Sequence, residues 1–122
     1  MLYTKEGNEM ASEKKALLVV FKADKLPAKS EMRERFKNLY HIYRDHPAIE
    51  SKSWFINEEK NEWGAFYVFR SDKLLQEYLK CDLWLKEIPG RWGKPAVVTI
   101  LDLAAVLSKE SITQPQDSWL SE

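Results

Sequence analysis

The chain has 122 residues, of which 44% are hydrophobic and 31% charged, a composition typical of a single soluble globular domain. Nineteen Lys and Arg balance nineteen Asp and Glu, so charge gives no reason to expect nucleic acid or an anionic membrane as a partner. No apolar run approaches the ~20 residues that span a bilayer, the start resembles no targeting signal, and the single cysteine, Cys81, excludes an internal disulfide. We therefore expect a cytoplasmic protein with one folded domain (14–107) between a flexible leader (1–13) and a flexible tail (108–122).

The first half of the domain predicts a strand, a helix and a second strand. KALLVVFKA (15–23) is almost continuously apolar, as in a strand that is buried on both faces. A helix is expected to begin near Ser30, which can cap it, and to stop at Pro47. Its apolar stripe recurs at helical spacing and consists of Met32, Phe36, Leu39, Tyr40 and Tyr43. IESKSWFIN (49–57) alternates, which indicates the second strand.

The centre of the chain predicts a hairpin and a second helix. EEKN (58–61) is a turn that leads into NEWGAFYVFR (61–70), a strand with aromatic residues on both faces. Ser71 then caps a helix, SDKLLQEYLKC (71–81), whose buried side carries Leu74, Leu75, Tyr78 and Leu79.

The end of the domain predicts a short helix, DLWLKEI (82–88), which Pro89 and Gly90 break, and a last apolar strand, PAVVTILDLAAVL (95–107). The order is therefore strand, helix, strand, strand, helix, strand. Right-handed crossovers place the first and third strands at the centre of an antiparallel sheet and both helices on one face. The predicted fold is ferredoxin-like α+β.

The face of this sheet that the helices cannot cover is predicted to be apolar. The first, third and fourth strands are apolar on both faces, and Lys22, Thr99 and Asp102 are among the few interruptions. Such a patch exceeds the few hundred Å² that monomers tolerate, and burying it is favourable by roughly 25 cal/mol per Å². We therefore predict a homodimer in which two sheets pack face to face.

The segment KSWFINEEKNEWGAFYVF, the helix ending EYL and the later VVTILDL resemble the YdhR-like monooxygenase family of the dimeric α+β barrel superfamily. The resemblance covers residues 15–107 and rests on the Lys-x-Trp pair, the Asn-x-x-Gly-x-x-Tyr-x-Phe spacing, the final strand and the order of the elements. It implies a pocket between sheet and helices, and oxidation of a small aromatic or enolisable compound by O2 without flavin, haem or metal. The alternatives are a non-catalytic dimer that senses or carries a hydrophobic ligand, and an interaction module that fills the pocket with its own side chains.

Six residues are candidates for the site. Lys52 and Trp54 point to one side of the second strand. Trp54 would donate its indole N–H to a substrate oxygen or belong to the core, and Lys52 would stabilise a phenolate or enolate or extend to solvent. Tyr67 would donate a hydrogen bond to the substrate while Phe69 stacks on it; alternatively, both pack in the core with the hydroxyl bonded to a backbone carbonyl. We predict Lys52, Trp54 and Tyr67 as catalytic, and add Trp63, Phe69 and Trp84 as substrate contacts.

Trp84 and Trp92 lie around the segment that closes the pocket in related folds. The loop GRWGKP (90–95) contains Trp92. It is either a lid, with Arg91 steering an acidic substrate, or a plain connector.

The remaining polar candidates are predicted to be structural. Asn57 and Asn61 flank the hairpin and are interpreted as turn residues. His41 lies opposite the apolar stripe, and neither it nor His46 is predicted to be a base in a pocket. Cys81 has no histidine at a recognisable spacing and is expected to be a half-buried apolar residue. No paired Cys or His at metal spacing and no glycine-rich phosphate loop occur, and the second helix has no histidine, which disfavours haem degradation.

Overall fold

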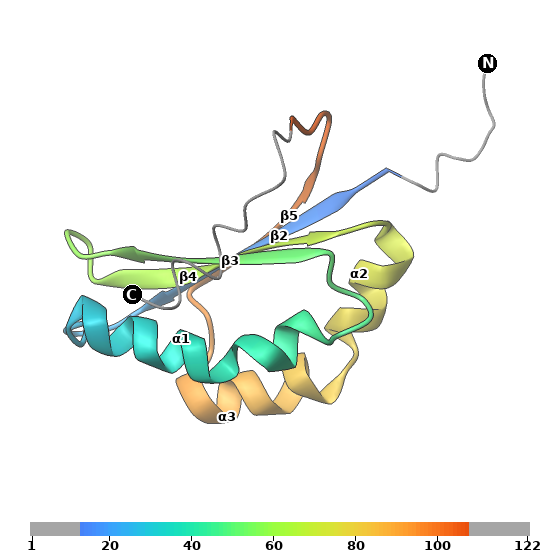
Figure 1. The fold of residues 1–122 in the computed structure, drawn as a ribbon. Helices are drawn as coiled ribbons and strands as arrows, with labels where there is room; N and C mark the ends of the chain where they lie inside the picture. The colour runs from blue at the N-terminus through green and yellow to red at the C-terminus, as the bar shows by residue number, and fades with distance from the viewer. Residues whose placement is uncertain (1–12, 108–122) are drawn as a thin grey trace, which may run out of the picture.

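The computed structural model describes residues 13–107 and is built on a four-stranded antiparallel sheet (Figure 1). The strand order is β3-β4-β2-β5, so the first and third predicted strands are central, as expected. The strands are β2 (Lys15–Lys22), β3 (Ser51–Asn57), β4 (Glu62–Phe69) and β5 (Val97–Asp102). β3 and β5 are shorter than the predicted ranges 49–57 and 95–107. The tail predicted at 108–122, and the leader up to residue 12, lie outside the described residues.

All helices of the described residues lie on one face of this sheet (Figure 1), which confirms the ferredoxin-like arrangement. They are α1 (Lys29–Arg44), α2 (Asp72–Leu79), the π-helix η2 (Leu83–Glu87) and α3 (Ile88–Trp92). Ser71 caps α2 as predicted, because its hydroxyl accepts the Leu74 N–H at 3.3 Å. The predicted cap at Ser30 is wrong: α1 begins one residue earlier, after Ala28, and has no side-chain cap.

The predicted helix break at Pro89 and Gly90 is also wrong, because α3 runs through both residues to Trp92. Proline is tolerated in the first turn of a helix, where its missing N–H would have no partner anyway. The helix ends at Gly93, whose φ of 83° favours glycine. Trp92 is thereby carried on a helix, with its ring centroid 4.6 Å from that of Trp63.

The core lies between the sheet and the helices and follows the alternation of the strands. The apolar helix-facing residues of the two central strands are all buried: Leu17, Val19, Phe21, Trp63, Ala65, Tyr67 and Phe69. Large side chains from the helices complete it, among them Met32, Phe36, Tyr43, Leu75 and Tyr78. No described element covers the opposite face, where Leu18, Val20, Phe66 and Val68 are half-buried.

The edge strand β5 is exposed to solvent on both faces of the sheet. Val97 and Leu101 face away from the helices and are 43% and 40% exposed. Val98 and Ile100 face the helical side but are still 46% and 47% exposed, so the helix layer does not reach over β5.

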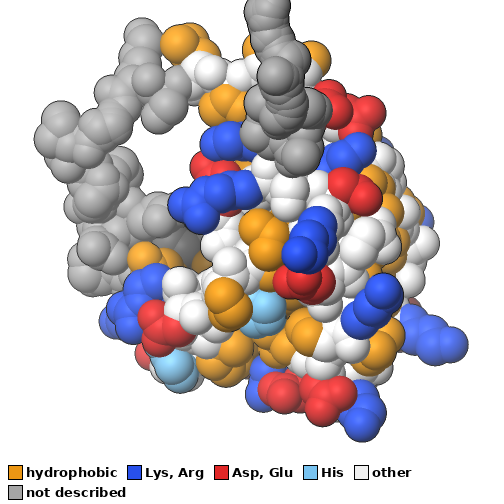
Figure 2. Space-filling model, turned by 90° about the vertical axis from the view of Figure 1, so that its right-hand side faces the viewer, with side chains coloured by type: hydrophobic (Ala, Val, Ile, Leu, Met, Phe, Trp, Pro, Cys, Tyr) orange, Lys and Arg blue, Asp and Glu red, His pale blue; other side chains and the backbone are white. Residues whose placement is uncertain are grey.

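The face of the molecule drawn in Figure 2 is mixed in charge. Figure 2 shows Lys and Arg side chains interspersed with Asp and Glu over one face, with no extended area of a single sign. Within residues 13–107, no helix has the length and apolar character that crossing a membrane requires.

Candidate active site

The candidate site lies where the helix-facing side of β3 and β4 meets α1. Lys52 is paired in register with Tyr67, and Trp54 with Ala65. Because side chains alternate along a strand, Lys52 and Trp54 share the helix-facing side, as predicted. Tyr43 of α1 packs edge-on against Trp54 and Tyr67, with ring centroids 5.7 Å and 6.3 Å away.

The amine of Lys52 is enclosed by the rings of Tyr43, Trp54 and Tyr67. Its Nζ lies 3.1 Å from the ring centroid of Tyr43, 4.5 Å from that of Tyr67 and 4.7 Å from that of Trp54. The alternative in which the Lys52 amine extends to solvent is therefore wrong, although the residue as a whole is only half-buried. No carboxylate in the described part of the chain pairs with it, and burial holds its pKa well below the ordinary value. We call Lys52, Tyr43, Trp54 and Tyr67 the lysine cage.

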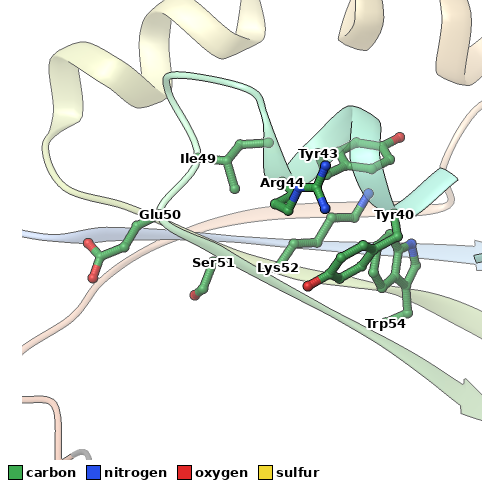
Figure 3. Close-up of a pocket in the computed structure, with 8 residues that line it drawn as sticks. All are labelled: Tyr40, Tyr43, Arg44, Ile49, Glu50, Ser51, Lys52 and Trp54. Atoms are coloured by element: carbon green, nitrogen blue, oxygen red, sulfur yellow. The ribbon is translucent and has the colours of Figure 1, made fainter. Parts of the chain in front are cut away.

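An outer hollow of about 130 Å³ opens on one side of the lysine cage. In Figure 3 the Lys52 side chain is directed toward the ring of Tyr43, and the side chains of Tyr40 and Arg44 lie nearby. The residues that line the outer hollow are Tyr40, Tyr43, Arg44, Ile49, Glu50, Ser51, Lys52 and Trp54.

An inner cavity of about 20 Å³ lies on the other side of the lysine cage, in the core. This is space for about one water molecule. Most of its lining is aromatic, namely Phe21, Tyr43, Trp54, Trp63, Tyr67, Trp84 and Trp92, with Lys52 among them. Tyr43, Lys52 and Trp54 line both spaces, so they form the wall between them.

The structure therefore brings together five of the six candidate site residues, which are Lys52, Trp54, Trp63, Tyr67 and Trp84. Phe69 is not among the lining residues; it is fully buried and stacks on Tyr67 at 5.9 Å. Trp92 lines the cavity although it was expected only near a lid. Its helical position was missed because proline and glycine precede it.

Tyr67 is hydrogen-bonded to a residue that the sequence reasoning left in the core. The Tyr78 hydroxyl donates to the Tyr67 hydroxyl at 2.9 Å, so the expected backbone carbonyl is not its partner. Burial raises the pKa of both hydroxyls, and it raises the pKa of Tyr43 to about 12. All three phenols are therefore protonated at neutral pH and can donate hydrogen bonds. The buried stripe of the second helix already contained Tyr78, but nothing in that stripe indicated which hydroxyl it would meet.

Cys81 and His46 lie outside both spaces but in contact with each other. Cys81 is half-buried, as predicted. Its Sγ lies 3.9 Å from His46 Nε2, a contact between residues 35 apart in the chain that sequence spacing did not indicate. His46 Nδ1 accepts the Ala48 N–H at 3.1 Å, and burial lowers the pKa of the ring. His41 is exposed, as predicted.

The remaining predictions concern the turn and the last helix. Asn57 and Asn61 are turn residues, as predicted: the Asn57 Oδ1 accepts the Lys60 N–H at 3.3 Å, and Asn61 has a φ of 54°. Arg91 lies on α3 and lines a separate open hollow with Arg35 and Trp92, so the first half of the predicted lid is helical. No group of three or more His, Cys, Asp or Glu is placed to hold a metal ion within residues 13–107.

The fold and the site together define a class: a ferredoxin-like α+β domain with an aromatic site between sheet and helices. A family model described as "Putative mono-oxygenase ydhR" matches residues 17–109, and the chain belongs to this family. The resemblance found in the sequence is thus confirmed. No curated protein matches the chain.

Solved structures share the fold. A protein of unknown function from Nitrosomonas europaea, NE2512, superposes with a TM-score of 0.61 at 12% identity, covering 83% of this chain and 99% of its own. SnoaB, a cofactor-independent oxygenase from Streptomyces nogalater, has a TM-score of 0.53 at 11% identity over 81% and 99% of the two chains. A "putative antibiotic biosynthesis monooxygenase" from Caulobacter crescentus has a TM-score of 0.54 at 17% identity over 80% and 93%. At these identities the likeness concerns the fold alone.

Proposed function

We propose that this protein oxygenates a small aromatic or enolisable compound with O2 and without flavin, haem or metal. Membership of a monooxygenase family supports the reaction class, and the shared fold of the cofactor-independent oxygenase SnoaB supports the lack of a cofactor. The observation that carries the proposal is the amine of Lys52, enclosed by aromatic rings and facing a hollow, with no carboxylate beside it among residues 13–107.

The first step is removal of a proton from the substrate by Lys52. Burial favours the neutral amine, which can accept a proton from an acidic C–H or O–H in the outer hollow. The ammonium that forms is stabilised by the rings around it and by the substrate anion next to it. From the sequence, Lys52 was expected only to stabilise a phenolate or enolate. In the role proposed here it first removes the proton and then stabilises the anion as an ammonium.

The second role is hydrogen bonding to the oxygen on which negative charge develops. Tyr67 accepts a hydrogen bond from Tyr78 and so keeps its own proton free for a substrate oxygen. Such a chain of hydroxyls polarises in one direction, which strengthens the terminal donor. Trp54 makes no hydrogen bond within residues 13–107, so its indole N–H is a second donor.

The substrate anion itself reduces O2. A peroxide forms at the reacting carbon and collapses to a carbonyl, so a CH2 group and O2 yield C=O and H2O. One oxygen atom enters the substrate and the other leaves as water. Because the inner cavity has room for about one water, we place the reacting carbon in the outer hollow beside Nζ.

We also propose that the protein acts as a cytoplasmic homodimer formed through the sheet face opposite the helices. The uncovered apolar residues of this face, together with the bare edge strand β5, support the association. The single cysteine and the even charge balance support the location.

The test is O2 uptake by metal-free protein with an anthrone as substrate. We expect turnover in the wild type and in the exposed-lysine control Lys60→Met. We expect losses of about 10²-fold or more in Lys52→Met and of about tenfold in Tyr67→Phe and Trp54→Phe. Uptake that is unchanged in all three variants would reject these roles.

The alternative is a non-catalytic dimer that binds a hydrophobic ligand in the outer hollow of about 130 Å³. The nearly filled inner cavity instead supports the interaction module whose pocket is filled by its own side chains. A ligand-binding dimer would bind an anthrone, as seen by quenching of tryptophan fluorescence, without consuming O2. Turnover therefore separates the two functions.

A further inference from the structure

Lys52 differs in its surroundings from the lysines whose ion pairs the structure shows. Lys14 pairs with Glu50 at 2.6 Å, Lys22 with Glu62 at 3.7 Å, and Lys15 with Asp102. Each of these amines lies next to a carboxylate near the surface. The Lys52 amine is instead enclosed by three rings and lies in the wall of a hollow that opens to solvent.

We propose that Lys52 is a covalent binding site for small aromatic aldehydes and ketones, which enter the outer hollow and form a Schiff base with Nζ. An amine in apolar surroundings is the form of lysine that acts as a nucleophile toward carbonyl carbon. This inference is independent of the oxygenase reaction, because it requires neither O2 nor proton removal from the substrate.

The chemistry balances without a co-reactant. The Nζ lone pair attacks the carbonyl carbon, and one of the two amine protons passes to the carbonyl oxygen to form a carbinolamine. The hydroxyl group takes up a second proton from solvent and leaves as one molecule of water. A C=N bond thus replaces C=O, the imine nitrogen keeps the remaining amine proton, and nothing is oxidised or reduced. The protonated imine is a cation, and the rings of Tyr43, Tyr67 and Trp54 that face Nζ stabilise it as they would an ammonium.

The lining of the hollow defines the class of ligand. The walls around Nζ are aromatic, which favours a flat ring attached to the carbonyl group. The charged residues at the hollow are Arg44, which stacks on Tyr40 and pairs with Asp45, and Glu50, which is engaged by Lys14. Both charges are therefore already partly compensated, and an uncharged carbonyl compound fits better than an ionic one.

The groups facing Nζ also determine how the reaction depends on pH. Tyr43 and Tyr67 remain protonated because burial raises the pKa of each, so neither becomes a counter-ion below pH 10. The Lys52 amine therefore has no anionic partner among these groups that would raise its pKa, and burial lowers it. A free lysine side chain with the ordinary pKa near 10.4 becomes reactive only as the pH approaches that value.

The experiment is reductive trapping on the full chain with benzaldehyde and cyanoborohydride at pH 7, followed by peptide mapping. Among the lysines, we expect the fastest benzyl adduct at Lys52, formed at least about tenfold faster than at Lys60, because each unit of lowered pKa increases the neutral fraction about tenfold. For N-acetyl-lysine, whose side chain has the ordinary pKa near 10.4, the rate should rise about a hundredfold from pH 7 to 9, whereas the rate at Lys52 should rise much less.

The matched variants are Lys52→Met, which should lose the fast adduct, and Lys60→Met, which should retain it. Circular dichroism checks that both are folded. Equal labelling of Lys52 and Lys60 in the wild type, or the same pH dependence at Lys52 as in N-acetyl-lysine, would overturn the proposal without any variant. Fast trapping without O2 uptake would reject only the oxygenase, and uptake without trapping would reject only the covalent site.

Discussion

At the scale of the single residue, Lys52 poses an energetic question, because a buried amine without a carboxylate costs stability. Desolvation disfavours the ammonium. Contact with an aromatic ring at a desolvated site offsets about 2 kcal/mol of this cost. The amine therefore contributes less to folding than an apolar side chain of the same length would. Such a residue is typical of a functional position rather than of a stabilising one.

We predict that Lys52→Met raises the free energy of unfolding at pH 7 by roughly 1–3 kcal/mol. Burial lowers the pKa of Lys52 in the folded state below its unfolded value near 10.4, so the unfolded chain binds the proton more tightly. Wild-type stability gains from this group as the pH rises toward 10.4, and the advantage of the variant must shrink over that range.

The measurement is urea unfolding of both proteins between pH 7 and 10. The buried tyrosines, whose pKa values burial raises, favour unfolding only above about pH 10 and are present in both proteins, so they cancel. Lys60→Met, at an exposed position of the hairpin turn, is the control for replacing a lysine with methionine. A constant difference for Lys52→Met would show that its amine is charged in the folded protein.

At the scale of the element, β4 runs unusually close to its neighbours at Gly64. A Cβ there would lie 2.0 Å from the Val19 carbonyl oxygen of β2 and 2.7 Å from the Phe55 ring of β3. Phe55 is the register partner of Gly64, so its ring lies over the glycine. The glycine thus allows the aromatic strand to pack into the centre of the sheet, which holds Trp63 and Tyr67 at the site.

We predict that Gly64→Ala lowers the free energy of unfolding by more than about 2 kcal/mol, because the backbone of β2 must move. The matched control is Gly90→Ala in α3, where nothing lies within 4 Å of the added Cβ. Alanine favours a helix over glycine, so this variant should gain about 0.5–1 kcal/mol. Thermal unfolding measures both, and equal shifts would contradict the close approach of β2 and β4.

At the scale of the whole molecule, the helices leave a large apolar surface without cover. They pack over β3 and β4, while β5 and the opposite face of the sheet remain open (Figure 1). Val97 and Leu101 are exposed on that opposite face, where β5 continues the surface of β2. A second copy of the chain would bury this surface.

We predict that Leu101→Lys converts a dimer into a monomer, because it places a charge in the proposed interface. Leu85→Lys is the control: Leu85 is also apolar and is 55% exposed, but it lies on η2, on the helical side. Size-exclusion chromatography with light scattering reports the mass of each variant. A wild-type protein that is monomeric at micromolar concentration would refute the face-to-face dimer.

Local pattern was enough to predict the order of the elements and part of the site. Alternation placed Lys52 on the same face as Trp54, and Tyr67 on the same face as Trp63. The two-residue period of a strand is a local property and does not depend on the neighbouring strands. Ser71 was identified as a cap for the same reason, since the bond it makes reaches only three residues along the chain. Ser30 and Pro89 show the limit of such signals, because both residue types are also accepted inside the first turn of a helix.

The sequence by itself determined which faces are apolar and which aromatic residues share a face. Tertiary structure alone decided that Lys52 is held as a buried amine, that Tyr67 meets Tyr78, and that Cys81 meets His46. The reason is physical: desolvation and hydrogen bonding depend on what another element brings into contact. Tyr43 reaches Lys52 from α1, and only the packed fold determines the distance between them.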